Sequence, residues 1–368
     1  MTDNEEFSPE WFSKPGDTIV ELMAIRDLTV ADLADATAYE TTDIREILSG
    51  TGHVTDELAE KLGDILGGSG NFWRQREANY RRCLRQAADR IDPKEVSAWL
   101  KQFEKKQLAD FGWVPRHETR KVQLEAYLAF FSVATPQEWE KRYSATLSEH
   151  LYRTSQAYES DPAALSAWLR RGEVEAASMP VQPFSTAAIQ KRIPAMRELT
   201  RRRDIVSALR SLQRLCGECG IALAYVQRPK RCVASGAMRV TPEGKTAILL
   251  SFRHRSEDHF WFSFFHELGH VLMHRDHSTL IDEGTSETEE LEAEANAFSA
   301  NVLVPRQHRD ELEALPPSPK AIIRFARKIG ISAGIVVGQM EFARAVKPGR
   351  LTKLKRRYTD EVLQQIVV

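Results

Sequence analysis

Residues 259–274, HFWFSFFHELGHVLMH, form an aromatic and apolar run that contains the pattern His-Glu-x-x-His and no proline. We expect a buried helix here. The side chains of His266 and His270 project from the same face of this helix about one turn apart, because the two residues are four positions apart. Both imidazoles can therefore bind one metal ion. Glu267 lies about 100° around the helix, close enough to act on a water beside the ion without being a ligand. The His-Glu-x-x-His pattern is a specific sign of a metal site only when an acidic third ligand follows it in the sequence.

A second helix, expected at residues 289–305 (EELEAEANAFSANVLVP), offers that third ligand. Its apolar residues recur at helical spacing, and Pro305 ends it. Glu292 is the favoured ligand and Glu294 the alternative, because the two point in different directions and only one can reach the ion. Asn296 lies one turn after Glu292, where its amide can steady a ligating histidine. The other acidic residues at the start of this helix are interpreted as surface charge, which the helix dipole favours.

Together the two segments resemble the ImmA/IrrE family of zinc metallopeptidases. The hallmark of that family is a His-Glu-Leu-Gly-His helix followed by a Glu-x-x-Ala-Asn-x-Phe-Ala-type helix that ends near a proline. The matching residues are 266–274 and 292–305. Ser299 stands where alanine is usual, and VLVP at 302–305 replaces Leu-Leu-Met-Pro; neither change touches the expected chemistry. The resemblance implies endoproteolysis, often of a helix-turn-helix repressor protein.

Two further histidines lie at spacings that bring them toward the metal-binding face of a continuous helix. His259 precedes His266 by seven residues, and His274 follows His270 by four. Either could donate to the oxyanion that forms during hydrolysis or orient a ligand, and His274 could compete as a ligand. The alternative for both is a partly buried histidine or a helix-end cap. Asp258 is expected to be the N-cap of this helix.

Composition narrows the class of protein. The 368 residues suffice for two or three domains, and a formal net charge of −1 argues against a global field for polyanions. No apolar run approaches a membrane span, and the first residues lack a signal-peptide pattern, so we expect a cytoplasmic protein without a membrane partner. Four cysteines do not suggest a disulfide framework. The C-x-x-C pair Cys216 and Cys219 ends a predicted helix and is interpreted as buried packing rather than as a redox or zinc site.

Residues 15–80 read as four or five short helices with a brief turn between the second and third, the layout of a helix-turn-helix module. Thr29 and Thr55 are the expected N-caps of the second and fourth helices, and Gly50 follows the third. The module resembles the antitoxin-type, HigA-like branch of the Cro/repressor family. The residues that carry this resemblance are PGD at 15–17, VADLA at 30–34, ILSG at 47–50, NFW at 71–73 and NY at 79–80.

DNA binding by this module is an open question at the level of sequence. Thr41, Thr42 and Arg45 on the expected recognition helix could read base edges. However, residues 40–49 carry one arginine against three acidic residues, and this charge of −2 opposes a polyanion. Specific DNA binding and a module kept for homodimerisation or for docking a protein substrate both remain expectations.

We expect three parts: a helix-turn-helix domain at 1–90, a helical connector at 91–183, and a zincin-like metallopeptidase domain at 184–368. The fold class is mainly α with a small β-sheet: an all-α module, the connector, and an α+β domain. Aromatic residues are expected to form the core of the connector: Trp99, Phe103, Trp113, Trp139, Tyr152 and Trp168.

Three apolar segments before the metal helix read as strands. They lie at residues 221–226, 232–240 and 245–252. In zincin-type peptidases an extended substrate adds to a sheet edge beside the metal. Residues 247–251 are the candidate edge strand, and a buried central strand is the alternative.

The leading function is a metal-dependent endopeptidase, a hydrolase that cuts a helix-turn-helix repressor or partner regulator in transcriptional, stress or phage-related regulation. His266, His270 and Glu292 would hold Zn²⁺, or Mn²⁺, because imidazole and carboxylate suit several first-row ions. Glu267 would act as general base and then as general acid. The alternative is a DNA-binding regulator or antitoxin whose zinc site is sensory or structural. A base beside the ligands favours chemistry, because a purely structural zinc needs none.

Overall fold

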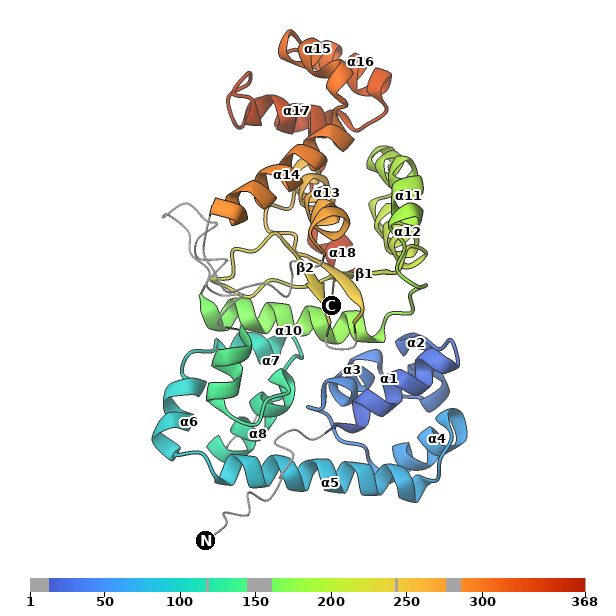
Figure 1. Cartoon of the computed structure of the whole chain (residues 1–368), viewed down its shortest axis with the longest axis vertical. Coiled ribbons are helices and arrows are strands. Elements are labelled where there is room, and N and C mark those ends of the chain that lie inside the picture. Colours follow the sequence, from blue (N-terminus) through green and yellow to red (C-terminus); the bar gives the residue numbers. More distant parts are fainter. Residues whose placement is uncertain (1–12, 117–118, 144–160, 242–243, 276–285, 368) are drawn as a thin grey trace. The chain divides into compact units, whose positions relative to one another are not determined.

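The computed structural model describes residues 13–116, 119–143, 161–241, 244–275 and 286–367. The chain divides into two compact units, Met1–Ala145 and Thr146–Val368, which run from blue to green and from green to red in Figure 1. Helices dominate both units and a small sheet lies in the second, so the predicted fold class is confirmed. Within the described part of the chain, none of the helices combines the length and the apolar character that crossing a bilayer requires.

The first unit opens with five helices: α1 (Pro15–Ile25), α2 (Val30–Thr37), α3 (Thr41–Ser49), α4 (Asp56–Leu66) and α5 (Gly70–Asp89). Their ends confirm the predicted caps. The hydroxyls of Thr29 and Thr55 each accept a hydrogen bond from the third backbone N–H of their helix, and Gly50 ends α3 in the left-handed conformation. Buried apolar side chains from α1 to α4 form one core with Trp73 of α5.

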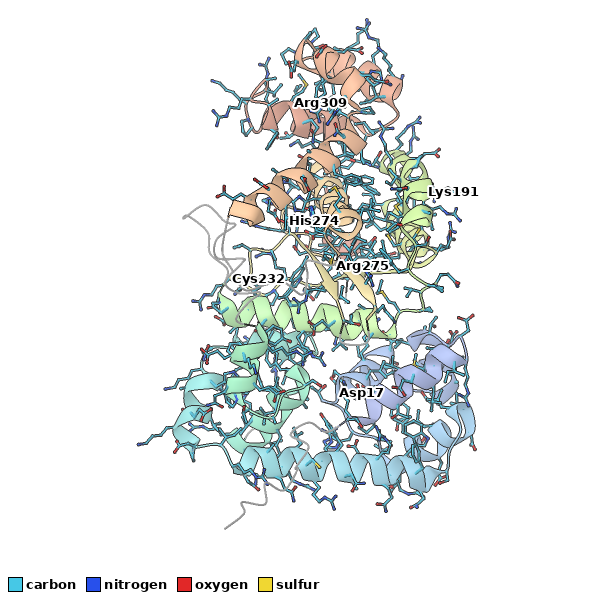
Figure 2. The ribbon with its side chains drawn as sticks, in the orientation of Figure 1. Asp17, Lys191, Cys232, His274, Arg275 and Arg309 are labelled. Carbon is cyan, nitrogen blue, oxygen red and sulfur yellow. The ribbon has the colours of Figure 1, made fainter. Side chains whose placement is uncertain are left out.

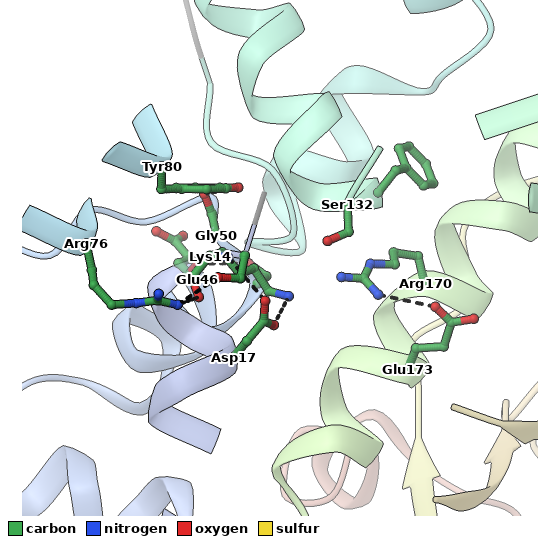
Figure 3. A network of polar contacts seen from close by, with 12 residues as sticks. Lys14, Asp17, Glu46, Gly50, Arg76, Tyr80, Ser132, Arg170 and Glu173 are labelled. Carbon is green, nitrogen blue, oxygen red and sulfur yellow. Dashed lines mark hydrogen bonds and ion pairs between the residues drawn. The ribbon is translucent and has the colours of Figure 1, made fainter. Parts of the chain in front are cut away.

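Polar contacts tie α5 to the start of α1 and to the end of α3 (Figure 3). Lys14 and Asp17 form an ion pair at the N-terminus of α1. Arg76 donates to the carbonyl oxygen of Lys14 at 3.3 Å, and Arg81 donates to that of Gly50 at 3.0 Å. These two arginines of α5 are therefore engaged in holding the module together.

The first unit continues with α6 (Pro93–Leu100), α7 (Lys105–Asp110) and α8 (Arg120–Phe131), and α8 packs against α5. An aromatic cluster fills its core: the ring of Trp99 lies 5.4 Å from that of Phe103 and 6.0 Å from that of Trp139, centroid to centroid. Trp113 is also buried. The predicted core residues of this stretch are confirmed, whereas Tyr152 lies outside the described residues.

The second unit is built on a three-stranded sheet of β1 (Ile221–Tyr225), β2 (Gly236–Val240) and β3 (Thr246–Leu250). The strand order is β1-β3-β2, with β1 parallel and β2 antiparallel to β3. The candidate edge strand at 247–251 was therefore wrong. It belongs to the central strand, which is buried along its whole length because both neighbours and both faces cover it. The two edge strands are β1, whose residues are all buried, and β2, whose residues are half-buried.

Helices cover both faces of this sheet (Figure 1). Helix α10 (Pro162–Ser178) packs against β1 and β3, and α13 (Glu257–Met273) contacts β2 and β3. The second part of the predicted connector thus packs on the sheet, and Trp168 and Leu169 are buried there. The other elements of this unit are α11 (Thr186–Glu198), η1 (Leu199–Arg201), α12 (Ile205–Gly217), α14 (Ser286–Leu303), η3 (Arg306–His308), α15 (Arg309–Glu313), α16 (Pro319–Ile329), α17 (Ala333–Phe342), η4 (Thr352–Leu354) and α18 (Asp360–Leu363).

A clamp of charged side chains holds the first turn of α13. We define it as Lys355, Arg356 and Glu341 with the buried Glu257 and Asp258. The ammonium of Lys355 lies 2.7 Å from Asp258 and 2.5 Å from Glu341. The guanidinium of Arg356 lies 2.5 Å from Glu257, whose side chain is 1% exposed. An unpaired charge beside the buried Glu257 and Asp258 would lower the free energy of unfolding. The C-terminal segment and α13 therefore stabilise each other.

Asp258 was expected to be the N-cap of α13, and this was wrong, because the helix starts two residues earlier than expected, at Glu257, and Ser256 is the N-cap. Burial alone would raise the pKa of Asp258, but hydrogen bonds from Lys355 and Ser256 outweigh it and hold that pKa below its usual value. Burial alone would lower the pKa of Lys355, but its hydrogen bonds to Asp258 and Glu341 raise it. The lowered pKa of Asp258 stabilises the folded state above about pH 4, and the raised pKa of Lys355 stabilises it below about pH 10. The clamp therefore stabilises the fold fully between these two limits.

Replacing Lys355 with methionine leaves two carboxylates without their cation. We expect a loss of about 3 kcal/mol at pH 7, seen as a fall of roughly 6–12 °C in the unfolding temperature. The difference from the wild type should shrink below about pH 4, where Asp258 becomes protonated. Lys353→Met, at an exposed position in the same segment, is the control and should change little. If circular dichroism gives the same unfolding temperature for Lys355→Met and the wild type, the clamp does not stabilise the fold.

Candidate metal centre

The metal-binding face forms where α13 packs along α14. Gly269 of α13 faces α14, and a Cβ atom there would lie 3.1 Å from the ring of Phe298 and 3.3 Å from Cα of Ala295. Glycine therefore lets the two helix backbones approach closely. His266 and His270 extend from α13 toward Glu292 on α14, as the i, i+4 spacing predicts.

Three side chains converge at this face, and we call His266, His270 and Glu292 the triad. The Nε2 atoms of the two histidines are 3.1 Å apart. Oε2 of Glu292 lies 3.3 Å from Nε2 of His266, and Oε1 lies 3.1 Å from Nε2 of His270. Donors in a tetrahedral site with bonds of about 2.0–2.1 Å lie about 3.3–3.4 Å apart. The two imidazole nitrogens lie close to that separation, and each has one oxygen of the Glu292 carboxylate at a similar distance. The three side chains are therefore close enough together to bind one metal ion.

The surroundings of His266 also suit a cation. Its Nδ1 lies 3.1 Å from Oδ1 of Asn296. The amide oxygen accepts a hydrogen bond from Nδ1–H, which leaves the lone pair of Nε2 available to a metal ion. Burial alone would lower the pKa of His266, but the hydrogen bond to Glu292 and the charges of Glu267 and Glu292 raise it above its usual value. The potential that favours a proton at this point favours a metal ion equally.

The ring of His270 is oriented by a hydrogen bond at Nδ1, the nitrogen that faces away from the triad. Its Nδ1 lies 3.0 Å from Nδ1 of His274, which is the C-cap residue of α13 (Figure 2). Nε2 of His274 lies 2.9 Å from Oε2 of Glu294. The structure thus places Glu294, the alternative third ligand, against His274 and not in the triad. His274 itself contacts a ligand rather than joining the triad.

Glu267 is 8% exposed and lies against the first residue of β2. A Cβ atom on Gly236 would come within 2.7 Å of both Cγ and Oε1 of Glu267. Only glycine leaves room for the carboxylate at this position. The sequence pattern gave no role to Gly236, since a glycine at the start of a strand signals a close approach without naming the partner.

The structure does not bring the remaining candidates to the triad. His259 lies about 10 Å along α13 from His266 and stacks on His254, with ring centroids 4.0 Å apart. Burial lowers the pKa of both rings, that of His254 to about 4. The candidate DNA-contacting residues lie on α3 of the first unit, where Thr42 is exposed while Thr41 and Arg45 are half-buried.

This constellation has the form of a metallopeptidase site, and a family comparison agrees. Residues 233–338 match the model of a peptidase family described as the IrrE N-terminal-like domain. The matched segment spans β2, β3, α13 and α14 and thus holds the triad and Glu267. The match supports a peptidase assignment for this part of the chain and agrees with its resemblance to the ImmA/IrrE peptidases. No curated protein and no solved structure matched the chain.

Removing one donor of the triad should disrupt metal binding. We expect Glu292→Gln to raise the dissociation constant for Zn²⁺ by more than about 100-fold, because loss of a ligand should exceed the 10–100-fold effect of an outer partner. Competition with a chromophoric chelator measures this. Glu290→Gln, an exposed position on the same helix, should bind as the wild type does. Equal affinity of Glu292→Gln and Glu290→Gln would contradict the triad as a metal site.

Proposed function

We propose that the second unit is a zinc-dependent endopeptidase that cuts a peptide bond of a protein substrate. His266, His270 and Glu292 are the metal ligands, and Glu267 is the general base. The observation that carries the proposal is the triad: two imidazole nitrogens and a carboxylate that converge at one point, with the buried Glu267 directly after the first histidine. We favour zinc because tetrahedral nitrogen and oxygen sites suit it, whereas manganese, the alternative, prefers oxygen-rich octahedral sites.

The chemistry assigns one task to each group. A divalent ion at the triad supplies Lewis acidity to a water and to the scissile carbonyl. Glu267 takes the proton of the attacking water and delivers it to the nitrogen of the leaving amine. The water oxygen bonds to the carbonyl carbon, the C–N bond breaks, and the products are a carboxylate and an amine. Asn296 keeps the His266 ring oriented, and Gly236 leaves Glu267 the space for its carboxylate.

The hydrogen bonding of β2 indicates where a substrate binds. The carbonyl oxygen of Ser235 accepts from the N–H of Ser251 at 2.9 Å, and the N–H of Thr241 donates to Lys245 at 2.9 Å. Residues 235 and 241 thus both face the central strand. Because such pairs alternate along an antiparallel ladder, residues 237 and 239 also face it.

It follows that Gly236, Met238 and Val240 direct their N–H and C=O groups away from β3, toward the outer edge of the sheet. An extended peptide that pairs with this edge runs beside Glu267, since Gly236 is in contact with that carboxylate. Main-chain pairing gives affinity without demanding particular side chains. We therefore propose β2, rather than the strand first favoured, as the substrate edge.

For the first unit we propose the docking of a protein substrate, a helix-turn-helix repressor or partner regulator. Residues 15–89 carry eight Lys and Arg against fourteen Asp and Glu, a net charge of −6. Arg74 is paired with Glu60, and Arg76 and Arg81 bond to backbone carbonyls. A module of this charge suits a basic protein better than DNA. DNA binding through α3, the basis of the alternative regulator function, stays a prediction.

Glu267→Gln tests the proposed function. The amide cannot accept the proton of the water, so we expect cleavage to fall by a factor of about 100–10,000 while the fold and the bound zinc are retained. Cleavage of purified regulator proteins, followed by mass spectrometry beside a zinc assay, measures both properties. Glu290→Gln is the matched control on the exposed face of α14. Undiminished cleavage by Glu267→Gln would rule out this mechanism.

Met238→Pro tests the substrate edge. Proline removes an N–H that faces outward and leaves the ladder to β3 intact, as edge strands tolerate. We expect kcat/KM to fall by about 10-fold, since one backbone hydrogen bond to the substrate is lost, with zinc affinity unchanged. Met238→Leu keeps the N–H and should behave as the wild type. If the proline variant cleaves at the wild-type rate, the substrate does not pair with this strand.

A further inference from the structure

We propose that Glu294 is a positioning residue that selects the imidazole tautomer with which His270 binds a metal, acting through His274. The proposal rests on the proposed metal site and gives a role to a residue outside the triad. The side chain of Glu294 is 62% exposed, so packing does not account for its orientation toward His274.

The three groups form a chain that leads from solvent to the triad. Oε2 of Glu294 lies 2.9 Å from Nε2 of His274, and Nδ1 of His274 lies 3.0 Å from Nδ1 of His270. His274 is 4% exposed. Each distance is that of a hydrogen bond. Two hydrogen bonds therefore connect Glu294, through His274, to Nδ1 of His270, the ring nitrogen that faces away from the triad.

The direction of this chain decides whether His270 is a ligand. An imidazole binds a metal through Nε2 only when that nitrogen carries no proton, so the proton of neutral His270 must be on Nδ1. There it is donated to Nδ1 of His274. That nitrogen must then be an acceptor, so His274 carries its own proton on Nε2 and donates it to Glu294. A carboxylate has no proton to donate, so Glu294 permits this direction alone.

The opposite direction would block the site. If His274 carried its proton on Nδ1 and donated it to His270, the proton of His270 would be on Nε2, at the position where the ligand atom must be free. Nε2 of His274 would then need a hydrogen-bond donor. A glutamine at position 294 has the shape of glutamate but offers an amide N–H, which stabilises the reversed chain. In that variant a metal ion can bind only after the proton leaves Nε2 of His270, whereas glutamate at position 294 keeps that nitrogen unprotonated.

The test is a double-mutant cycle on zinc affinity, measured by chelator competition with the full chain. Glu294→Gln should raise the dissociation constant by about 10-fold, the lower end of effects from partners of metal-ligating histidines. In a His274→Asn background the same change should alter affinity by less than about two-fold, because the chain is already cut. Glu290→Gln, which removes an exposed carboxylate from the same helix, should leave affinity unchanged.

Each contrary outcome has a separate meaning. If the wild type binds zinc and Glu294→Gln binds it equally well, the role of Glu294 is refuted while the proposed peptidase stands. If Glu294→Gln weakens binding as much in the His274→Asn background, Glu294 acts by charge and not through His274, which also overturns the proposal. If the wild type itself binds no zinc, the proposed function fails together with the role of Glu294. Circular dichroism of the wild type and the four variants confirms that each is folded.

Discussion

The close approach of α13 to α14 is the constraint on which the rest of the site depends. Gly269 permits that approach, and it brings Glu292 to within 3.3 Å of both imidazoles. The same contact places Asn296 behind one histidine, while Glu294 reaches the other through His274. The proposed ligands and the side chains that contact them thus come from one helix pair. The clamp of charged side chains fixes the start of α13, and the sheet supports its length.

Much of this could be predicted from the sequence, because it depends on residues near one another in the chain. Helix ends followed from Thr29, Thr55 and Gly50, and the histidine face followed from a spacing of four residues. Contacts between distant segments could not be predicted. Whether an apolar strand is central or at an edge depends on which neighbours pair with it, and the sequence does not state this. Likewise no local pattern joins Lys355 to Asp258 across 97 residues.

The two units differ in what their charges do. In the first unit Arg74, Arg76 and Arg81 of α5 contact a glutamate and backbone carbonyls, and residues 15–89 as a whole are acidic. In the second unit buried carboxylates and histidines gather at one helix face, where they favour a cation. A predicted helix-turn-helix layout therefore says little about its partner until the contacts of its cationic side chains are known. Recognition of a protein by the first unit and hydrolysis of a peptide bond by the second are the division of labour that we propose.

X-ray absorption spectroscopy of the zinc-loaded protein tests the central claim most directly, because it reports the donor atoms themselves. The account predicts nitrogen and oxygen donors at about 2.0–2.1 Å with the multiple-scattering signature of two imidazoles. The chain also contains three buried cysteines, Cys216, Cys219 and Cys232. Sulfur donors at about 2.3 Å would show that zinc binds to cysteine thiolates instead, and that result would contradict the triad as the metal centre of this protein.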